Sequence, residues 1–322
     1  MNTGAVQAVV DLGGEEVGRL LDGVERRMSE LAVGHGPLLA RHAVETIAAG
    51  GKRLRPLLVC LAAGAPPAET DGLLRAAVAV ELVHAATLIH DDVLDGSPLR
   101  RGRPTVFASG GRSMATATGD LLFSRAFAEL APSGSVQAVR VLSRAARDLA
   151  QGELMQRADA FAQEASVERY LERCRLKTAV LFRAACELGA LDAGGPAEPL
   201  GAFGEQIGLA FQILDDVLDV TGPPERTGKP RGADLLDGTV TLPLILAGQR
   251  DPVLASLDLR AVRTPGEAAQ VCERIAATGA LEEARSRALE QVAGARDALP
   301  PLPERQRTAL ELVADGVVQR YS

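Results

Sequence analysis

The amino-acid sequence predicts an all-α protein, and three observations support that prediction. Alanine, leucine, glutamate and arginine dominate most segments, and apolar positions recur at spacings of three and four residues. The alternation of apolar and polar residues that marks a half-buried strand does not extend over any useful length. Proline and glycine separate the helical segments, as at Gly50-Gly51, Pro66-Pro67 and Gly222-Pro223-Pro224.

The predicted helices follow one another along the whole chain. In chain order they are expected at residues 14–33, 37–49, 54–64, 70–95, 113–131, 134–157, 166–191, 197–220, 240–249, 265–277, 279–297 and 302–319. The segments 70–95 and 197–220 are apolar on nearly all sides, which predicts central positions in the core. No long linker-like stretch interrupts the pattern, so the chain is expected to form a single domain over residues 1–322.

Composition limits the possible functions. The net charge of −7 argues against a nucleic-acid-binding protein, because such proteins carry a basic surplus. Four separated cysteines without a CxxC pattern are expected to be buried thiols in a reducing compartment. The start of the chain lacks the basic and apolar regions of a signal peptide, and no apolar stretch is expected to span a membrane. These features predict a cytoplasmic protein without a transmembrane segment.

Two identical Asp-Asp-Val-Leu-Asp segments, Asp91–Asp95 and Asp215–Asp219, are the strongest chemical signal. On a helix, the first and last aspartates of each segment share a face. Each segment follows an apolar run and lies near a predicted helix C-terminus, where carboxylates repel one another and meet the negative end of the helix dipole. Mg²⁺ would relieve that repulsion, since it binds one or two carboxylates together with phosphates and water. A solvated helix end explains one such segment far better than two identical copies.

Basic residues gather at two places that suit an anion. Gly50-Gly51-Lys52-Arg53-Leu54-Arg55-Pro56 places three cations at a predicted helix start, where backbone N–H groups also favour negative charge. Arg100-Arg101-Gly102-Arg103-Pro104 follows the first acidic segment closely, which suggests a metal-bound diphosphate between the two. A solvated charged face is the alternative for either cluster alone. The chain has only three lysines, and each lies in or beside a phosphate-compatible segment: Lys52, Lys177 and Lys229.

Five motifs in order resemble those of the trans-isoprenyl diphosphate synthases, also called polyprenyl synthetases. They are GGKRLRP (50–56), HDDVLDGSPLRRGRP (90–104), LKTAVLF (176–182), FQILDDVLD (211–219) and TGKPRGADLLDG (227–238). The resemblance implies the isoprenoid synthase fold, a single large helical bundle around a central cavity, usually in a homodimer. It also implies a Mg²⁺-dependent prenyltransferase of the EC 2.5.1 class. Such an enzyme joins an allylic prenyl diphosphate to isopentenyl diphosphate, with three Mg²⁺ ions bound beside the substrate.

The resemblance also assigns roles to residues at matching positions. The expected metal contacts are Asp91, Asp92, Asp95 and Asp215, with Asp216 and Asp219 nearby or acting through water. The expected contacts to isopentenyl diphosphate are Lys52, Arg55, His84 and Arg101, and the alternative for His84 is a core histidine. The expected contacts to the allylic substrate are Arg100, Lys177, Thr178, Gln212 and Lys229. The implied catalytic set is Asp91, Asp92, Asp95, Asp215, Asp216, Lys177 and Arg100.

One position departs from the family pattern. Many members carry lysine before the Thr-Leu-Pro segment, where this chain has Thr239. One diphosphate contact is therefore missing, or Arg231 replaces it.

Product length is expected to depend on the helix before Asp91. In the family, bulky residues just before the first motif stop growth at C15 or C20, whereas Thr87, Ala86 and Val83 are not bulky. A linear trans-polyprenyl diphosphate of C30 or longer is therefore expected, with a short-chain farnesyl or geranylgeranyl diphosphate synthase as the alternative. Phe123 and Phe127 are candidates for the floor of a product tunnel or for ordinary core packing.

Two further alternatives are less well supported. A terpene cyclase usually lines its pocket with aromatic rings that stabilise cations, but this chain has no Trp, two Tyr and seven Phe. A non-catalytic, prenyl-binding partner subunit would be expected to have eroded aspartate motifs, whereas both motifs are intact.

Overall fold

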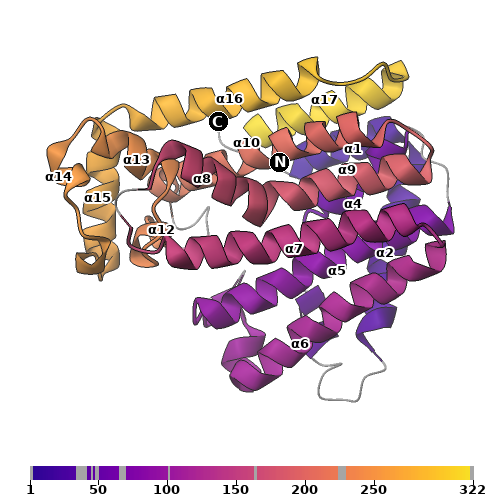
Figure 1. The fold of residues 1–322 in the computed structure, drawn as a ribbon, viewed down its shortest axis with the longest axis horizontal. Coiled ribbons are helices and arrows are strands. Elements are labelled where there is room, and N and C mark those ends of the chain that lie inside the picture. Colours follow the sequence, from indigo (N-terminus) through magenta and orange to yellow (C-terminus); the bar gives the residue numbers. More distant parts are fainter. Residues whose placement is uncertain are drawn as a thin grey trace. The chain divides into compact units, whose positions relative to one another are not determined.

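The computed structural model describes residues 3–33, 42–44, 46–47, 51–64, 70–100, 102–162, 165–223 and 230–319, with the backbone alone at residues 3–6. Within these ranges nearly all regular structure is helical, which confirms the all-α prediction (Figure 1). The chain divides into two compact units. Unit 1 comprises Met1–Ala146, Leu181–Gly204 and Ala298–Gly316. Unit 2 comprises Arg147–Val180, Glu205–Asp297 and Val317–Ser322.

Unit 1 contains the N-terminal helices and a short hairpin. Its elements are α1 (Thr3–Gly13), α2 (Glu15–Ala32), α4 (Leu54–Ala63), α5 (Asp71–Leu94), β1 (Leu99–Arg100), β2 (Arg103–Pro104), α6 (Val106–Leu130) and η1 (Ala131–Ser133). Unit 2 contains α8 (Val167–Cys174), the π-helical turn η2 (Arg175–Ala179), α12 (Ala233–Leu236), α13 (Leu242–Gly248), α14 (Pro252–Ala255), η3 (Leu259–Ala261), α15 (Pro265–Ala277) and α16 (Ala280–Asp297). Four helices carry residues assigned to both units: α7 (Val136–Ala158), α9 (Val180–Asp192), α10 (Ala197–Thr221) and α17 (Glu304–Gln319).

Helix α5 is the core helix of unit 1, as its apolar composition predicts. Its N-terminus is capped by the Thr70 hydroxyl, which accepts a hydrogen bond from the Leu73 backbone N–H at 2.9 Å. Helix α6 packs along α5 (Figure 1). Contrary to the sequence expectation, α5 is long and apolar enough to cross a membrane, with a mean hydropathy of 1.6 over its most apolar window. However, 67% of that window is buried inside the protein, as is common for the core helix of a globular protein.

Helix α6 begins earlier than the sequence predicted. The expected start was residue 113, but the Thr105 hydroxyl accepts a hydrogen bond from the Ala108 backbone N–H and caps a helix that begins at Val106. Gly111 interrupts the helical backbone with a φ of 75°, a conformation that glycine adopts without steric cost. The Gly110-Gly111 pair therefore marks a kink inside α6.

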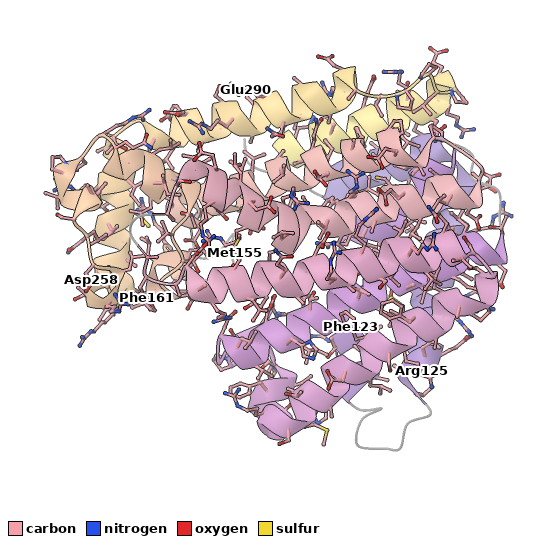
Figure 2. All side chains as sticks on the ribbon, in the orientation of Figure 1. Phe123, Arg125, Met155, Phe161, Asp258 and Glu290 are labelled. Carbon is pink, nitrogen blue, oxygen red and sulfur yellow. The ribbon has the colours of Figure 1, made fainter. Side chains whose placement is uncertain are left out.

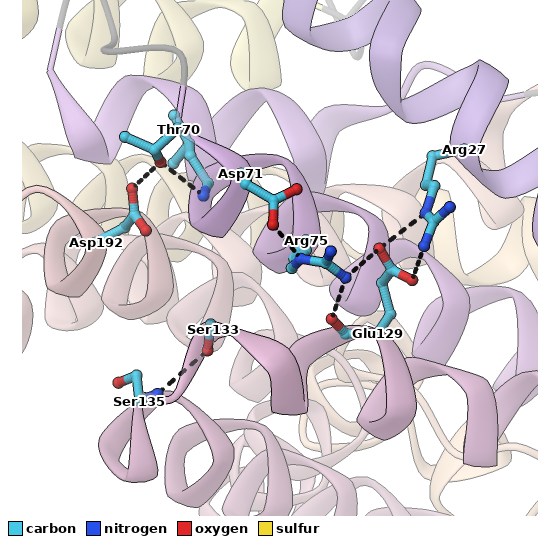
Figure 3. A network of polar contacts seen from close by, with 9 residues as sticks. Arg27, Thr70, Asp71, Arg75, Glu129, Ser133, Ser135 and Asp192 are labelled. Carbon is cyan, nitrogen blue, oxygen red and sulfur yellow. Dashed lines mark hydrogen bonds and ion pairs between the residues drawn. The ribbon is translucent and has the colours of Figure 1, made fainter.

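A buried carboxylate joins three helices of unit 1 (Figure 3). Glu129 on α6 is 4% exposed and accepts two hydrogen bonds at 3.0 Å from Arg27 on α2. Arg75 on α5 donates to the same carboxylate at 3.3 Å and also pairs with Asp71. Two guanidinium groups therefore compensate the burial of Glu129, and removal of either would leave a poorly compensated buried charge.

Several elements differ from the sequence prediction. The expected helix 166–191 is two α-helices joined by the π-helical turn η2, and the short elements α1, α12 and α14 were not expected. The expected helix 37–49 lies mostly outside the described residues. All four cysteines are free and buried, as predicted.

Candidate active site

In each acidic motif the second aspartate is buried, while the others keep some exposed surface. Asp92 on α5 and Asp216 on α10 are each 4% exposed. Asp91, Asp215 and Asp219 are half-buried, and Asp95 is exposed. This pattern follows from helical geometry: residues four apart share a face, whereas the second aspartate is turned about 100° from the first.

In unit 1 the buried Asp92 is paired with a cation. Arg100 donates from Nε to Asp92 Oδ1 at 2.8 Å, and its Nη2 forms an ion pair with the same oxygen at 2.8 Å. The short hairpin returns Arg100 toward the helix, and the Ser97 N–H donates to the Asp92 carbonyl oxygen at 3.0 Å. The structure therefore brings together a residue expected to contact metal and a residue expected to contact the allylic diphosphate.

In unit 2 the buried Asp216 is held by neutral donors. The Tyr170 hydroxyl donates to Asp216 Oδ2 at 2.7 Å, and Gln212 Nε2 donates to Oδ1 at 2.8 Å. The Thr178 hydroxyl donates to Gln212 Oε1 at 2.8 Å, so these four side chains form one hydrogen-bonded chain. Burial raises the pKa of Asp216, and the nearby Asp234 carboxylate raises it further, although the hydrogen bonds from Tyr170 and Gln212 oppose this shift.

Lys177 and Thr178 lie in the π-helical turn η2, a feature that often occurs at functional sites. Lys177 forms an ion pair with Glu153 on α7, and Arg157 also donates to Glu153. Gly152, the residue before Glu153, lets α7 approach the turn η2 closely. A Cβ at Gly152 would lie 2.5 Å from the Lys177 backbone nitrogen. Glu153 and Gly152 therefore determine where Lys177 lies.

The basic motif at the start of α4 places its three cations in different surroundings. Lys52 is exposed, whereas Arg53 pairs with Glu25 and Glu81 and so holds α4 against α2 and α5. The Arg55 guanidinium packs over the Phe182 ring at 4.7 Å, and its Nε has no hydrogen-bond partner in the described part of the chain. Burial lowers the pKa of Arg55 to about 10, although Glu81 raises it, so Arg55 remains charged at neutral pH. A charged, incompletely paired guanidinium suits an anionic ligand.

The remaining residues predicted to contact the diphosphates are only partly described by the structure. His84 on α5 is half-buried, while Arg101 and Lys229 lie outside the described residues. Thr239 donates its backbone N–H to the Asp234 carbonyl oxygen at 2.8 Å. Arg231 donates from Nε to the Val220 carbonyl oxygen at 2.6 Å and lies 4.0 Å from Glu273. Arg231 is therefore engaged at the C-terminal end of α10.

Two of the three residues expected to set product length are fully buried. Val83 and Ala86 have no exposed surface, and Thr87 is half-buried with its hydroxyl bonded to the His84 carbonyl oxygen. The helix face upstream of Asp91 is therefore buried at Val83 and Ala86 and keeps some exposed surface at Thr87. On α6, Phe123 (Figure 2) pairs with Phe127 at a ring-centroid distance of 5.9 Å.

The acidic residues suit Mg²⁺ only if a ligand completes the coordination. Among the described residues, no three Asp, Glu, His or Cys side chains form a group that could hold a metal ion. Each motif instead offers two carboxylates of one helix face, Asp91 with Asp95 and Asp215 with Asp219. One or two carboxylates are what Mg²⁺ usually takes from a protein when phosphates and water supply the other ligands. The donor set therefore fits magnesium bound with a diphosphate.

Sequence reasoning missed three positions that the structure adds to the site. Tyr170 lies two helical turns before Lys177, and Gly152-Glu153 lies on the predicted helix 134–157. Neither Tyr170 nor Glu153 belongs to a charged cluster or a repeated motif. The seven-residue spacing of Tyr170 and Lys177 was the only available signal, and it is common in any helix.

Comparisons with known proteins agree with these features. The sequence model of the Polyprenyl synthetase family matches residues 37–276. The chain is 41% identical over 274 residues to "Heptaprenyl diphosphate synthase component 2" of Geobacillus stearothermophilus, covering 83% of this chain and 85% of that protein. It is 36% identical over 283 residues to "Geranylgeranyl diphosphate synthase" of Methanosarcina mazei, covering 84% and 86%.

A solved structure extends the similarity to almost the whole chain. The fold matches that of a polyprenyl synthase from Caulobacter crescentus, crystallised with calcium and isoprenyl diphosphate, with a TM-score of 0.91 and 37% identity. The match covers 97% of this chain and 98% of that chain. The all-α fold and the paired aspartate motifs thus define a prenyltransferase of isoprenoid biosynthesis. The chain belongs to the polyprenyl synthetase family, the trans-isoprenyl diphosphate synthases.

Proposed function

We propose that this protein is a Mg²⁺-dependent synthase of long linear trans-polyprenyl diphosphates, of C30 or longer. The proposed dependence on Mg²⁺ rests on one repeated arrangement. In each motif, two carboxylates share a helix face beside a buried, hydrogen-bonded aspartate. The substrates are an allylic prenyl diphosphate and isopentenyl diphosphate. Residues 1–322 act as one catalytic domain.

In the proposed reaction the allylic C1–O bond breaks and diphosphate leaves with the bonding electrons. The double bond of isopentenyl diphosphate attacks C1, and loss of a proton to the released diphosphate forms the new double bond. Bound Mg²⁺ supplies Lewis-acid stabilisation of the negative charge on the leaving group. Asp91, Asp92, Asp95 and Asp215 are proposed to hold the metal ions, with Asp216 and Asp219 nearby or acting through water.

The cationic side chains are proposed to bind and orient the two diphosphates. Arg100, Lys177, Thr178, Gln212 and Lys229 act on the allylic diphosphate, where preplaced positive charge stabilises the leaving group. Lys52, Arg55, His84 and Arg101 act on isopentenyl diphosphate. The incompletely paired Arg55 guanidinium supports this assignment.

A long product is supported by the residues before the first motif. Val83, Ala86 and Thr87 include no aromatic ring that would stop a growing tail. The 41% identity to a protein named as a heptaprenyl diphosphate synthase component points the same way. The similarity to a geranylgeranyl diphosphate synthase keeps a C20 product as the second candidate.

The decisive experiment uses the purified chain with farnesyl diphosphate, radiolabelled isopentenyl diphosphate and Mg²⁺, followed by chromatography of the dephosphorylated products. Linear products of C30 or longer are expected. Products that stop at C20 would refute the long-chain assignment, and cyclic hydrocarbons would refute synthase activity.

Two variants test the residues that set length. Ala86→Phe is expected to shorten the product, but Phe at this fully buried position could also overpack the core. Thr87→Phe provides a second test, because Thr87 is half-buried and has more room. If both folded variants give the wild-type product distribution, this helix face does not control length.

The relatives suggest two different subunit compositions. The family suggests a homodimer, whereas the relative named as a "component 2" suggests an enzyme of two different subunits. We propose a homodimer that is active alone. Light scattering together with activity of the purified chain tests this, and turnover that appears only after addition of a second protein would contradict it.

A further inference from the structure

We infer that Tyr170 is a positioning residue for prenyl transfer: its hydroxyl holds Asp216 and thereby orients the second acidic motif and the Thr178–Gln212 pair. This inference rests on the proposed function, because it assumes that Asp215 and Asp219 serve a metal-bound diphosphate. It assigns a role to a side chain outside every charged cluster of the sequence.

Both carboxylate oxygens of Asp216 already accept hydrogen bonds. Oδ2 accepts from the Tyr170 hydroxyl at 2.7 Å, and Oδ1 accepts from Gln212 Nε2 at 2.8 Å. Asp216 is also 4% exposed. A carboxylate with this burial and these partners acts as an anchor inside unit 2, while Asp215 and Asp219 retain exposed surface.

Tyr170 is itself held in place by its neighbours. It has no exposed surface, and the Arg173 guanidinium lies 5.6 Å from its ring centroid. Arg173 is in turn held by a hydrogen bond of 2.5 Å from Nη2 to the Val240 carbonyl oxygen. The Cys174 thiol is a further neighbour of the Tyr170 hydroxyl and is also buried. The donor to Asp216 therefore has little rotational freedom.

Loss of the hydrogen bond between Tyr170 and Asp216 would affect further residues of the site. Asp216 adjoins Asp215 on α10, so a change in its position turns the helix face that carries Asp215 and Asp219. Gln212 donates to Asp216 with its NH₂ group, which leaves its Oε1 to accept from Thr178. If Asp216 is displaced, the hydrogen bonds that orient Gln212 and Thr178 are therefore also lost. Thr178 is the residue after Lys177 in η2.

Tyr170→Phe tests the inference, since it removes only the hydroxyl and keeps the buried ring. Ile207→Val is the matched control, because Ile207 is a fully buried residue of α10 outside the hydrogen-bonded chain. Three quantities are measured for each: kcat as a function of Mg²⁺ concentration, KM for isopentenyl diphosphate, and the rise in Tm caused by Mg²⁺ with inorganic diphosphate. The Tm measurement requires no turnover.

For Tyr170→Phe, kcat is expected to fall roughly tenfold to a hundredfold, as for a loss of alignment in the transition state. The Mg²⁺ concentration for half-maximal rate should increase, and the diphosphate-dependent rise in Tm should shrink. KM for isopentenyl diphosphate should stay within about twofold of the wild-type value, because its proposed contacts are other residues. Ile207→Val should lower Tm slightly and leave the Mg²⁺ dependence unchanged.

Asp216→Asn and the double variant provide a second test that does not depend on Tyr170→Phe alone. If Tyr170 acts through Asp216, the two substitutions are non-additive, and the double variant is no worse than Asp216→Asn. Additive losses, or a Tyr170→Phe enzyme with unchanged Mg²⁺ dependence and Tm response, would overturn the inference. A wild-type protein without prenyl transfer would instead refute the proposed function.

Discussion

Gly119 has no Cβ, and this leaves room for the residue that precedes the first acidic motif. It lies on α6 opposite His90, the residue directly before Asp91, and a Cβ at Gly119 would lie 2.3 Å from His90 Nε2. His90 Nε2 is also 3.2 Å from Asp120 Oδ1, an ion-pair distance without hydrogen-bond geometry. The position of the His90 ring therefore depends on a glycine in the neighbouring helix.

Gly119→Ala is expected to push His90 aside and to displace the adjacent Asp91. Since small displacements of catalytic groups have large kinetic effects, kcat should fall about tenfold or more. Steady-state kinetics with saturating substrates and a melting curve measure the two effects separately. Gly18→Ala on α2 is the control, because its Cβ would meet nothing nearer than 4.0 Å. Equal activity of both variants would show that His90 has no influence on the motif.

At the scale of single residues, some parts of the site could be predicted from the sequence and others could not. The two acidic motifs could be predicted because they are repeated and carry dense charge. The separate role of Asp216 could not, because its burial depends on Tyr170, which lies 46 residues away in the chain. The basic motif at residues 50–56 was expected to bind an anion. Its Arg53 instead pairs with Glu25 and Glu81 on other helices, and the sequence gives no local sign of these contacts.

At the scale of elements, long apolar helices were predicted well and their interruptions were not. The segment 197–220 corresponds to α10 (Ala197–Thr221), since composition alone specifies a buried helix. The predicted helix 166–191 instead contains the π-helical turn η2, whose backbone lies close to Gly152 on α7. Such a contact between distant segments leaves no local pattern in the sequence.

Gly152→Ala is expected to separate α7 from η2. The added Cβ would lie 2.5 Å from the Lys177 nitrogen and 2.8 Å from the Leu176 carbonyl carbon, both backbone atoms that cannot rotate away. A loss of about 1–3 kcal/mol in the free energy of unfolding is expected from this overpacking. Activity should fall further because Lys177 moves.

Chemical denaturation and kinetics of the same Gly152→Ala preparation measure both effects. Gly266→Ala in α15 is the control, because its Cβ would meet nothing within 4 Å. A Gly152→Ala protein as stable and active as the control would show that the approach of α7 is not needed.

Helix α15 begins with a capping box formed by Thr264 and Glu267. The Thr264 hydroxyl accepts from the Glu267 N–H at 3.3 Å, and the Glu267 carboxylate accepts from the Thr264 N–H at 2.9 Å. Thr264→Ala removes one half of this capping box and should lower the free energy of unfolding by about 1 kcal/mol. Denaturant titration measures the change. Thr308→Ala is the control, since the exposed Thr308 hydroxyl only bonds back to the Glu304 carbonyl oxygen; similar losses in both variants would argue against a capping effect.

At the scale of the whole molecule, the expected ligand groups are distributed over the two units. The first acidic motif and the basic motif belong to unit 1, and the second acidic motif with Lys177 belongs to unit 2. The all-α fold class could be predicted because helical periodicity pervades the chain. The division into units could not, because each unit combines segments from distant parts of the sequence.

Mg²⁺ and inorganic diphosphate together are expected to stabilise the whole protein. Each motif offers two carboxylates of one helix face, so the metal needs diphosphate oxygens to complete its coordination. Ligand at a hundred times its Kd should add about 2.7 kcal/mol to the free energy of unfolding. Melting curves with both ligands, with each alone, and after chelation with EDTA measure this effect. The same increase in Tm with diphosphate alone would contradict a role for the metal.

The apolar surface of α5 has a consequence for biogenesis. While the chain is being synthesised, this helix is complete before α6 exists to cover it, and its composition suits a lipid environment as well as a protein core. A nascent chain that exposes such a segment is prone to aggregation and is a natural client for chaperones. Substitutions that loosen the packing of α6 against α5 would therefore lower the yield of folded protein in the cell before they lowered the activity of the molecules that do fold.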